Sequence, residues 1–342
     1  MSGVETRYVG KNEADQRLDK WFKHHFPALP FGRLQKLLRT GQVRVDGKRV
    51  RTNTRLESGQ AIRVPPLGET DGSRQDASDR QKAKAADPRD RDFIRSLVIY
   101  ADAHVIALDK PAGLAVQGGT NTERHIDGML DHLIGYDSKC SGERPRLVHR
   151  LDKDTSGVMV VARTLQAARK LGDAFRKKDS RKIYWAITVG VPRPMEGEID
   201  MPLSKGGGPG QEKVFGDQED GKSAITWFKV LDNAAAKAAV VALWPRTGRT
   251  HQLRAHLEAL GTPILGDGKY GGAEAFLGGD GIAKQVHLHA RELVLPGFDG
   301  KKTGPRLLAA VPDHMMQTFE VLGIDPLVSG DIDPFADFVA PK

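Results

Sequence analysis

The chain has 342 residues, of which 39% are hydrophobic and 28% are charged, so it is long enough for two well-packed domains of ordinary globular composition. No apolar run approaches the roughly 18 residues that a membrane helix requires, and the first residues lack the apolar core of a secretory signal. The single cysteine, Cys140, excludes an intramolecular disulfide framework. These features argue against a membrane or secreted protein and favour a reducing cytoplasm.

Basic charge is concentrated near the N-terminus. Residues 1–70 contain 14 Lys and Arg against 7 Asp and Glu, whereas the net charge of the whole chain is +8. The remaining 272 residues therefore carry a net charge of only +1. A local excess of cations is typical of a surface that binds the phosphate backbone of a nucleic acid.

Apolar residues at helical spacing predict two helices in this segment. Leu18, Trp21 and Phe22 indicate the first, and the second is expected from about residue 31 to residue 40, before Gly41. The second helix is two-faced, with three leucines on one side and three cations on the other. Its cations are Arg33, Lys36 and Arg39.

After this helix, the dipeptide Asp46-Gly47 inside QVRVDGKRV predicts a β-hairpin. The hairpin adds three cations, Arg44, Lys48 and Arg49. The cations of the helix and the hairpin either bind RNA or form a merely solvated face, and residue types alone leave both interpretations open.

The segments RLDKWF, RLQKLLRTGQVRVDGKRV and ESGQAIRV, within residues 14–65, resemble the small RNA-binding module named after ribosomal protein S-four. In that family the second helix and the hairpin cradle folded RNA. The resemblance implies that residues 1–70 form an RNA-binding α/β module.

Residues 71–92 mix charges of both signs without a large apolar side chain, which predicts a flexible linker. Helices are expected beyond it at about 164–178 and 250–260. Because helices and strands do not alternate regularly, residues 93–325 are expected to form an α+β domain around a mixed, largely antiparallel sheet with flanking helices, followed by a C-terminal tail at 326–342. The expected strands lie in SLVIYADAHVIALD, KIYWAITVG, AITWFKVL, AAVVALW and VHLHARELVL.

The stretch LVHRLDKDTSGVMVVART, residues 147–164, places charged side chains on a short loop before an apolar strand. From this segment alone, Asp152 is best explained as a turn residue whose carboxylate bonds local amides. A second segment, residues 246–272, changes this interpretation, because Arg254 sits near the buried side of a predicted helix. A partly buried guanidinium needs a carboxylate partner, since an unpaired charge there costs several kcal/mol.

Together, the two segments resemble the RluA-type family of RNA pseudouridine synthases. LVHRLDKDTSGVMVVA matches the catalytic-loop motif of that family, KIYWAITVG its tyrosine strand and TGRTHQLRAHLEALGTPILGDGKYG its arginine-helix motif. With DKPAGL and LHA, these motifs span residues 97–295 in the family's order. The S-four-like module in front points to the branches that modify large-subunit (23S) ribosomal RNA.

The resemblance implies a role for individual residues. Asp152 would be the catalytic aspartate, Arg254 its ion-pair partner and Tyr184 the side chain that stacks on the target uracil. Arg150 would enter the RNA when the uridine leaves the stack, and Leu288 would line the base pocket. Further residues expected to contact RNA are His149, Arg249 and His251.

The chemistry explains why these residue types are needed. Isomerising uridine to pseudouridine breaks the bond from uracil N1 to the anomeric carbon, turns the free base and joins its carbon 5 to the sugar. An ionised carboxylate in a dry pocket can attack the anomeric carbon or take the 2′ proton of the sugar, and both routes remain open. Burial raises the pKa of a carboxyl group, whereas a neighbouring Arg lowers it, so the arginine is expected to keep the aspartate charged.

No cofactor and no metal are expected. His251 and His256 are five residues apart on a helix, and His287 and His289 lack a Cys partner, so these residues are expected to be structural or RNA-facing. We expect a monomeric, cytoplasmic enzyme whose partner is ribosomal RNA of the large subunit. The alternatives are a non-catalytic rRNA-binding or ribosome-assembly factor, and a pseudouridine synthase that acts on tRNA.

Overall fold

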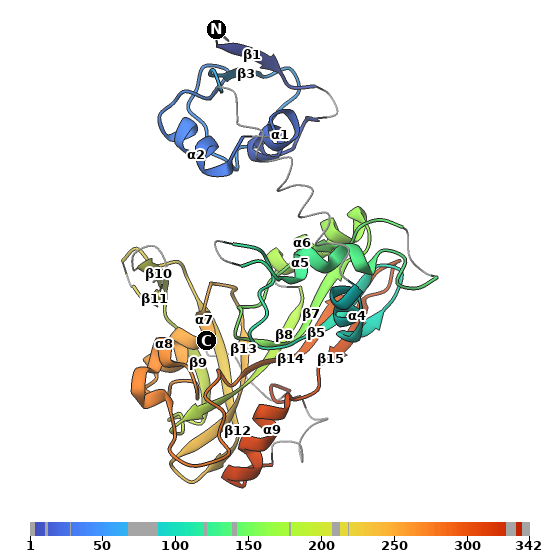
Figure 1. The fold of residues 1–342 in the computed structure, drawn as a ribbon. Helices are drawn as coiled ribbons and strands as arrows, with labels where there is room; N and C mark the ends of the chain where they lie inside the picture. The colour runs from blue at the N-terminus through green and yellow to red at the C-terminus, as the bar shows by residue number, and fades with distance from the viewer. Residues whose placement is uncertain are drawn as a thin grey trace. The chain divides into compact units, whose positions relative to one another are not determined.

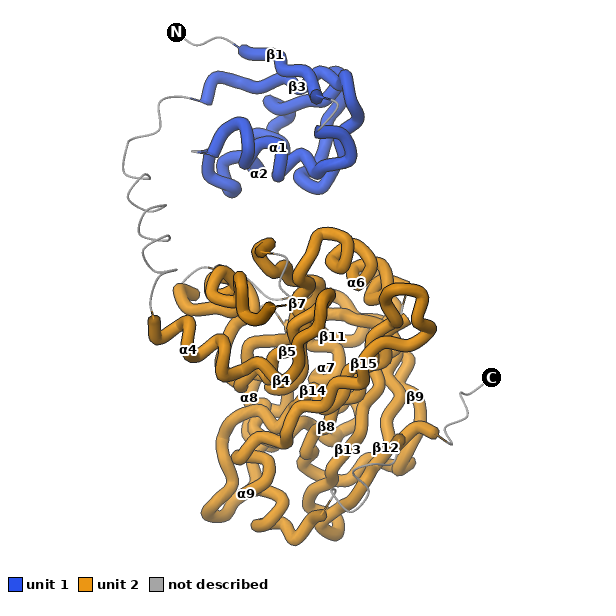
Figure 2. Tube along the Cα trace, turned by 90° about the vertical axis from the view of Figure 1, so that its right-hand side faces the viewer, with its two compact units in different colours: residues 1–84 blue, residues 85–342 orange. Residues whose placement is uncertain are grey.

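The structure is a computed structural model that describes residues 4–10, 13–27, 29–67, 88–119, 122–138, 142–177, 179–206, 213–217, 219–325 and 333–336. The chain divides into two compact units, residues 1–84 and 85–342, which Figure 2 shows in different colours. Each unit has its own hydrophobic core. No helix in the described ranges is both long and apolar enough to cross a membrane.

The N-terminal unit combines two helices with a small antiparallel sheet of order β1-β3-β2. Its elements are β1 (Glu5–Tyr8), α1 (Leu18–His25), α2 (Phe31–Arg39), β2 (Arg44–Val45) and β3 (Ala61–Val64). Both predicted helices are confirmed, and their apolar faces form the core with Val43, Ile62 and Val64. The three cations of α2 stay exposed, because the leucines bury the opposite side.

The predicted turn at Asp46-Gly47 is present, but the predicted hairpin is reduced to its tip. Both residues have positive φ, 48° and 74°, as a type I′ turn requires. Val45 and Lys48 exchange two backbone hydrogen bonds across the turn. Beyond this bridge β2 pairs with β3, which supplies the longer partner strand.

The linker predicted at 71–92 falls mostly outside the described residues, which resume at residue 88. Its last five residues belong to α4 (Pro88–Ser96), so that part of the prediction is wrong. Ile94 explains the helix, because it is fully buried against the core of the C-terminal unit. Polar composition at 88–92 reflects the exposed side of an anchored helix.

The C-terminal unit is built on a ten-stranded sheet whose main path runs β4-β5-β7-β14-β8-β13-β12-β9 (Figure 1). These strands are β4 (Val98–Ala101), β5 (Val105–Lys110), β7 (Ser156–Ala162), β14 (Leu288–Pro296), β8 (Arg181–Val189), β13 (Ala238–Pro245), β12 (Ile225–Ala234) and β9 (Glu196–Asp200). β6 (Arg146–Leu147) pairs with β7, and β15 (Thr303–Leu308) with β14. All described pairings are antiparallel except β7 with β14, which confirms the predicted mixed, largely antiparallel sheet.

Helices flank this sheet, and a separate two-stranded hairpin stands beside it. The helical segments are α5 (Ile126–Met129), η3 (Leu130–Leu133), α6 (Leu165–Lys177), α7 (Gln252–Ala259), α8 (Gly268–Gly271), η4 (Gly272–Ala275) and α9 (Asp313–Leu322). The hairpin strands are β10 (Leu203–Gly206) and β11 (Lys213–Gly216). The predicted helices near 164–178 and 250–260 correspond to α6 and α7.

Strict alternation along β8 directs its side chains to two different cores. Trp185 and Ile187 pack with Phe319 of α9, whereas Ala186 packs with Leu253 of α7. Tyr184 lies on the α7 side by the same alternation and also packs against that core. The Tyr184 side chain therefore lies on the side of the sheet that carries α7.

Gly157 joins the two parallel strands. It lies inside β7 and pairs with Ala290 of β14. Its φ is +107°, and a Cβ at this position would lie 2.3 Å from the carbonyl oxygen of Ala290. Only glycine lets the catalytic-loop strand approach β14 so closely.

Residues 333–336 are the described part of the predicted C-terminal tail. Phe335 is buried in the core beside α9, and its ring centroid lies 5.7 Å from that of Trp244. Asp333 makes a bidentate ion pair with Arg181 at the start of β8. This part of the tail is therefore packed against the sheet.

Candidate active site

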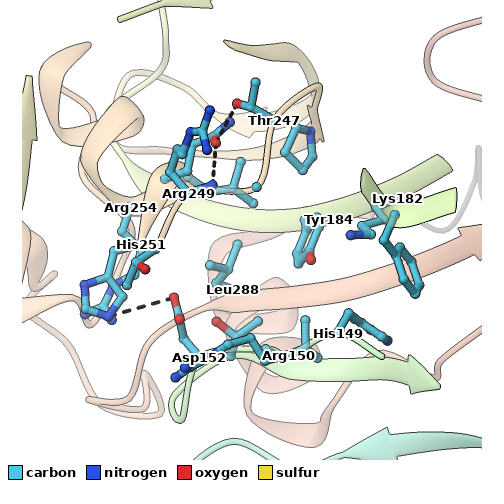
Figure 3. Close-up of a pocket in the computed structure, with 18 residues that line it drawn as sticks. His149, Arg150, Asp152, Lys182, Tyr184, Thr247, Arg249, His251, Arg254 and Leu288 are labelled. Carbon is cyan, nitrogen blue, oxygen red and sulfur yellow. Dashed lines mark hydrogen bonds and ion pairs between the residues drawn. The ribbon is translucent and has the colours of Figure 1, made fainter. Parts of the chain in front are cut away.

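A cavity of about 320 Å³ opens beside the loop that carries Asp152. Its wall is formed by that loop, by β8, by the segment between β13 and α7, and by the start of β14 (Figure 3). It brings together eight residues predicted from the sequence: His149, Arg150, Asp152, Tyr184, Arg249, His251, Arg254 and Leu288. Motifs more than 100 residues apart thus converge on one cavity.

The loop of Asp152 is fixed through its backbone by Lys110. The ammonium of Lys110 is fully buried and donates to the carbonyl oxygens of Pro111, Leu114 and Lys153 at 2.8 to 3.0 Å. Burial lowers the pKa of Lys110 to about 8, against the opposing charges of Asp154 and Asp152. The sequence did not single out this lysine, although it is the second residue of the DKPAGL motif, because a lysine at the end of a strand is usually solvated.

Asp152 presents a free carboxylate to the cavity. Its side chain is 22% exposed, and the titratable side chain at ion-pair distance among the described residues is His251, whose Nε2 lies 4.0 Å from Oδ2. Among the described residues, none donates a hydrogen bond to this carboxylate, so both oxygens remain available to a ligand. The turn interpretation, in which the carboxylate bonds local amides, is therefore wrong.

The predicted ion pair between Arg254 and Asp152 is replaced by one between Arg254 and Asp267. Nε and Nη2 of Arg254 each lie 2.6 Å from a carboxylate oxygen of Asp267, and both side chains are buried. Asp267 can hold the arginine because it is fixed at the N-terminus of α8, where it also accepts from the amide of Tyr270. The expectation that Arg254 needs a carboxylate was right, but the partner was wrong.

Arg254 still acts on Asp152 electrostatically, because both line the cavity. Burial works to lower the pKa of Arg254, but the hydrogen bond and charge of Asp267, together with the charges of Asp152 and Asp154, raise it overall. The arginine is thus a fixed positive charge. Asp267 was missed although GDGKYG lies in the same motif, because it could equally have been a solvated turn residue.

His251 lies between Asp152 and Tyr270 and contacts both. It occupies the left-handed region, with φ of 51°, directly before α7, and its Nδ1 lies 3.0 Å from the hydroxyl of Tyr270. Burial lowers the pKa of His251, against the charge of Asp152. A neutral imidazole is therefore favoured beside the carboxylate.

Tyr184 and Leu288 form the apolar middle of the cavity. Figure 3 shows them between Asp152 at one end and Lys182 at the other. Leu288 is buried, whereas Tyr184 is half-buried. Burial, followed by the charge of Asp152, raises the pKa of the Tyr184 phenol, so the ring is neutral and suited to stacking.

His149 has a structural function in addition to lining the cavity. Its Nε2 accepts from the amide of Val160 at 2.9 Å, and its ring packs on Phe175 at a centroid distance of 4.7 Å. Burial, and then the charge of Lys182, lowers the pKa of His149 to about 3. The neighbouring Arg150 is exposed at the cavity.

Gln252 is a further residue that the sequence did not single out. Its buried carboxamide donates to the carbonyl oxygen of Ile225 and the hydroxyl of Thr226, and it accepts from Thr247 and the amide of Arg249. All four hydrogen bonds lie between 2.7 and 3.0 Å. Gln252 thereby attaches the segment between β13 and α7 to β12.

The other three histidines weighed as metal ligands are buried in the interior. Burial lowers the pKa values of His256, His287 and His289 to about 4, and each ring contacts a protein polar group. Their structural interpretation is confirmed. Across the described ranges, no group of three His, Cys, Asp or Glu side chains is arranged to hold a metal ion.

The six remaining predicted residues belong to the N-terminal unit. Five of them are exposed, namely Arg33, Lys36, Arg39, Lys48 and Arg49. Arg44 is half-buried, and it donates to the carbonyl oxygens of Gly41 and Gly47, so it also holds the turn. A groove of about 770 Å³ in this unit is lined by four cations and no carboxylate: Arg17, Lys36, Arg39 and Arg51.

Comparisons with known proteins show the family of this chain. The family model described as RNA pseudouridylate synthase matches residues 104–259. Ribosomal large subunit pseudouridine synthase C of Rickettsia conorii is 36% identical over 82% of this chain and 88% of that protein, and its Salmonella typhi namesake is 32% identical over 92% and 95%. The solved structure of human RNA pseudouridylate synthase domain containing 4 is 30% identical with a TM-score of 0.58, covering 69% of this chain and 98% of that one. The RluA-type resemblance of the motifs is confirmed, and the chain belongs to the RNA pseudouridylate synthase family.

Proposed function

We propose that this isomerase converts uridine to pseudouridine in large-subunit ribosomal RNA, with Asp152 as its catalytic group. The observation that carries the proposal is the free carboxylate of Asp152 at one end of a cavity that also offers the ring of Tyr184. The names of the Rickettsia and Salmonella relatives support ribosomal RNA as the substrate. Such a substrate would also place the protein in the cytoplasm.

Asp152 would act on the sugar once the uridine has left the RNA stack. Its oxygen attacks the anomeric carbon as the bond to uracil N1 breaks, or it removes the 2′ proton so that a glycal forms. The free base then turns and its carbon 5 bonds to the anomeric carbon. In the first route the ester bond between the sugar and Asp152 breaks in this step, and in the second route Asp152 returns the 2′ proton to the sugar. The proton on carbon 5 then passes to solvent, and N1 of the base takes up a proton from solvent. Because Arg254 is held by Asp267, it can favour the charged carboxylate without occupying either oxygen.

The same cavity would offset the cost of extruding the base. Taking a nucleotide out of the stack costs a few kcal/mol, and stacking on an aromatic ring returns ~1 to 3 kcal/mol per base. Tyr184 and Leu288, which line the middle of the cavity, would contact the uracil. Arg150, exposed on the loop, would fill the space that the uridine vacates.

The N-terminal unit would supply RNA affinity. Its exposed cations and its groove without carboxylates suit the phosphate backbone of folded RNA. We propose that residues 1–70 act as an S-four-like RNA-binding module and that the enzyme works as a monomer.

Tritium release tests the reaction. A large-subunit RNA transcript that carries tritium at uracil carbon 5 should lose label to water with the full-length chain, and a tRNA transcript should not. Release from tRNA alone would reassign the substrate, and binding of ribosomal RNA without any release would favour a non-catalytic assembly factor. The monomer proposal is checked separately by sedimentation of the free protein.

A further inference from the structure

Lys182 occupies the end of the cavity opposite Asp152. It lies two residues before Tyr184 on β8, so both side chains project from the same face of the strand, roughly 7 Å apart along it. Figure 3 shows Lys182 beyond Tyr184 as seen from Asp152. A base stacked on Tyr184 would therefore have the carboxylate on one side and this ammonium on the other.

The ammonium of Lys182 has no acidic partner in the described part of the chain. Its contact is the ring of Phe175, 4.4 Å from Nζ to the centroid, and no hydrogen bond or ion pair accompanies it. Burial lowers the pKa of Lys182 to about 8, with no neighbouring carboxylate to raise it. A desolvated cation without a counter-ion is unfavourable in the free protein, which points to an anion supplied by a ligand.

A second cavity, of about 270 Å³, continues from the first beyond Lys182. Lys182 and Phe175 line both cavities. The second cavity also exposes three guanidiniums and no carboxylate; they belong to Arg176, Arg246 and Arg249. Arg176 pairs with Asp173, and Arg246 is held over the rings of Trp227 and Trp244 at 4.6 and 4.5 Å. The second cavity therefore has a positively charged lining and adjoins the first cavity at Lys182.

We propose that Lys182 binds a phosphate of the RNA strand next to the extruded uridine, and that the second cavity receives the strand that continues from it. This inference rests on the proposed function, because it assigns the substrate's phosphodiester to a position beside the reacting nucleotide. One end of the cavity would then hold the sugar at Asp152, and the other would hold the backbone.

The test compares Lys182→Met and Lys182→Arg in the full-length chain, with Lys170→Met as the matched control. Lys170 is exposed, also lies over a phenylalanine ring, that of Phe298 at 4.8 Å, and lines neither cavity. Single-turnover tritium release is measured against RNA concentration at several salt concentrations. Melting temperatures of the free proteins are measured in parallel.

Lys182→Met should raise the RNA concentration for half-maximal rate by about 10- to 100-fold, as expected for one lost charge-assisted hydrogen bond. The slope of log affinity against log salt should fall by about 0.7 to 0.9, while Lys182→Arg recovers much of both and Lys170→Met changes neither. The melting temperature of Lys182→Met should be unchanged or higher, because a half-buried charge that lacks an acidic partner among the described residues has been removed.

Unchanged affinity and salt slope in Lys182→Met would overturn the inference, and so would a lower melting temperature that accompanies the loss of affinity, since that would indicate a packing role. Failure of the proposed function is distinguishable. If the wild type releases no tritium from any RNA, the reaction is wrong, and the salt dependence of ribosomal RNA binding still tests Lys182.

Discussion

At the residue scale, two different carboxylates do what the sequence analysis expected of one. One carboxylate pairs with the buried Arg254, and the other faces the cavity. Asp267 satisfies the buried guanidinium of Arg254, and Asp152 is left without a hydrogen bond. A carboxylate engaged by an arginine fork would have to break two charge-assisted bonds before it could attack a sugar. Within the described residues, the observed arrangement keeps the positive charge nearby and leaves both carboxylate oxygens of Asp152 without a hydrogen bond.

Asp152→Asn should abolish tritium release, with a fall of at least about 10³-fold, because the amide can neither attack the anomeric carbon nor take a proton. Its free energy of unfolding should change by less than about 0.5 kcal/mol, since the side chain is partly exposed and makes no hydrogen bond. Chemical denaturation and RNA binding measured together provide the control. Appreciable residual turnover would remove Asp152 as the catalytic group.

Asp267→Ala should destabilise the protein by about 3 to 5 kcal/mol, because it leaves Arg254 charged, buried and unpaired. Arg254→Ala should cost a similar amount, and the double variant should cost less than the sum of the two. Asp152→Ala is the matched carboxylate control and should have little effect. Equal destabilisation by Asp152→Ala and Asp267→Ala in urea would mean that Arg254 is shared between them.

Lys182 should make stability depend on pH in a defined interval. Its pKa falls from the usual 10.5 to about 8 in the folded chain, so between these values the unfolded chain binds more protons and stability rises with pH. Below pH 8, Lys182→Met should be more stable than the wild type by about 1 to 3 kcal/mol. This gain in stability should disappear as the pH approaches 10.5. The quantity to measure is the difference in the free energy of unfolding between the two proteins. Lys110 titrates in the same pH range, but it is present in both proteins, so its contribution cancels in the difference. The same holds for Tyr184, His149 and the arginines of the second cavity. A constant difference across this interval would be inconsistent with a desolvated ammonium.

At the element scale, helix α7 and its preceding segment hold half of the cavity in place. Gln252, the first residue of the helix, makes four hydrogen bonds that reach β12 and the segment before the helix. Since Arg249 and His251 lie on that segment, their positions depend on the hydrogen bonds of the Gln252 carboxamide. This arrangement is a rigid support for the site, built into the start of a helix.

Gln252→Met should lower stability by about 2 to 4 kcal/mol, because the partners of four buried hydrogen bonds are left unsatisfied. It should also raise the RNA concentration for half-maximal tritium release. Thr247→Val removes one of the four bonds and should give a smaller effect in the same direction. If Thr247→Val lowers the free energy of unfolding in urea more than Gln252→Met does, the Gln252 carboxamide is not the main support of this segment.

The helices and strands could be predicted because their signals are local. Leu34, Leu37 and Leu38 mark the buried face of α2 within five residues, and the alternation of β8 is contained in KIYWAITV. Partners across the fold carry no such signal, so the pairing of Arg254 with Asp267 and the hold of Lys110 on the Asp152 loop could not be predicted. The family motifs brought the right residues into one cavity but did not specify which of them touch.

At the scale of the whole molecule, charge and chemistry reside in different units. The N-terminal segment of 70 residues carries 14 Lys and Arg against 7 Asp and Glu, whereas the cavity of the C-terminal unit holds a single carboxylate, Asp152. The proposed attraction of RNA by the N-terminal unit can therefore be tested separately from the proposed reaction in the C-terminal unit. The exposed cations of α2 can be substituted for this purpose, because the buried leucines of α2 then still hold the fold of the N-terminal unit.

The triple variant Arg33→Gln, Lys36→Gln and Arg39→Gln should weaken binding of ribosomal RNA and reduce the slope of log affinity against log salt by about 2 to 3, because each phosphate contact contributes roughly 0.7 to 0.9. Its control is the triple variant Lys237→Gln, Lys301→Gln and Lys302→Gln, which removes the same charge from exposed positions of the C-terminal unit. The single-turnover rate at saturating RNA should be unchanged in both, since neither touches the cavity. If both triples reduce the salt slope equally, net charge rather than the face of α2 governs RNA binding, and the S-four-like assignment loses its support.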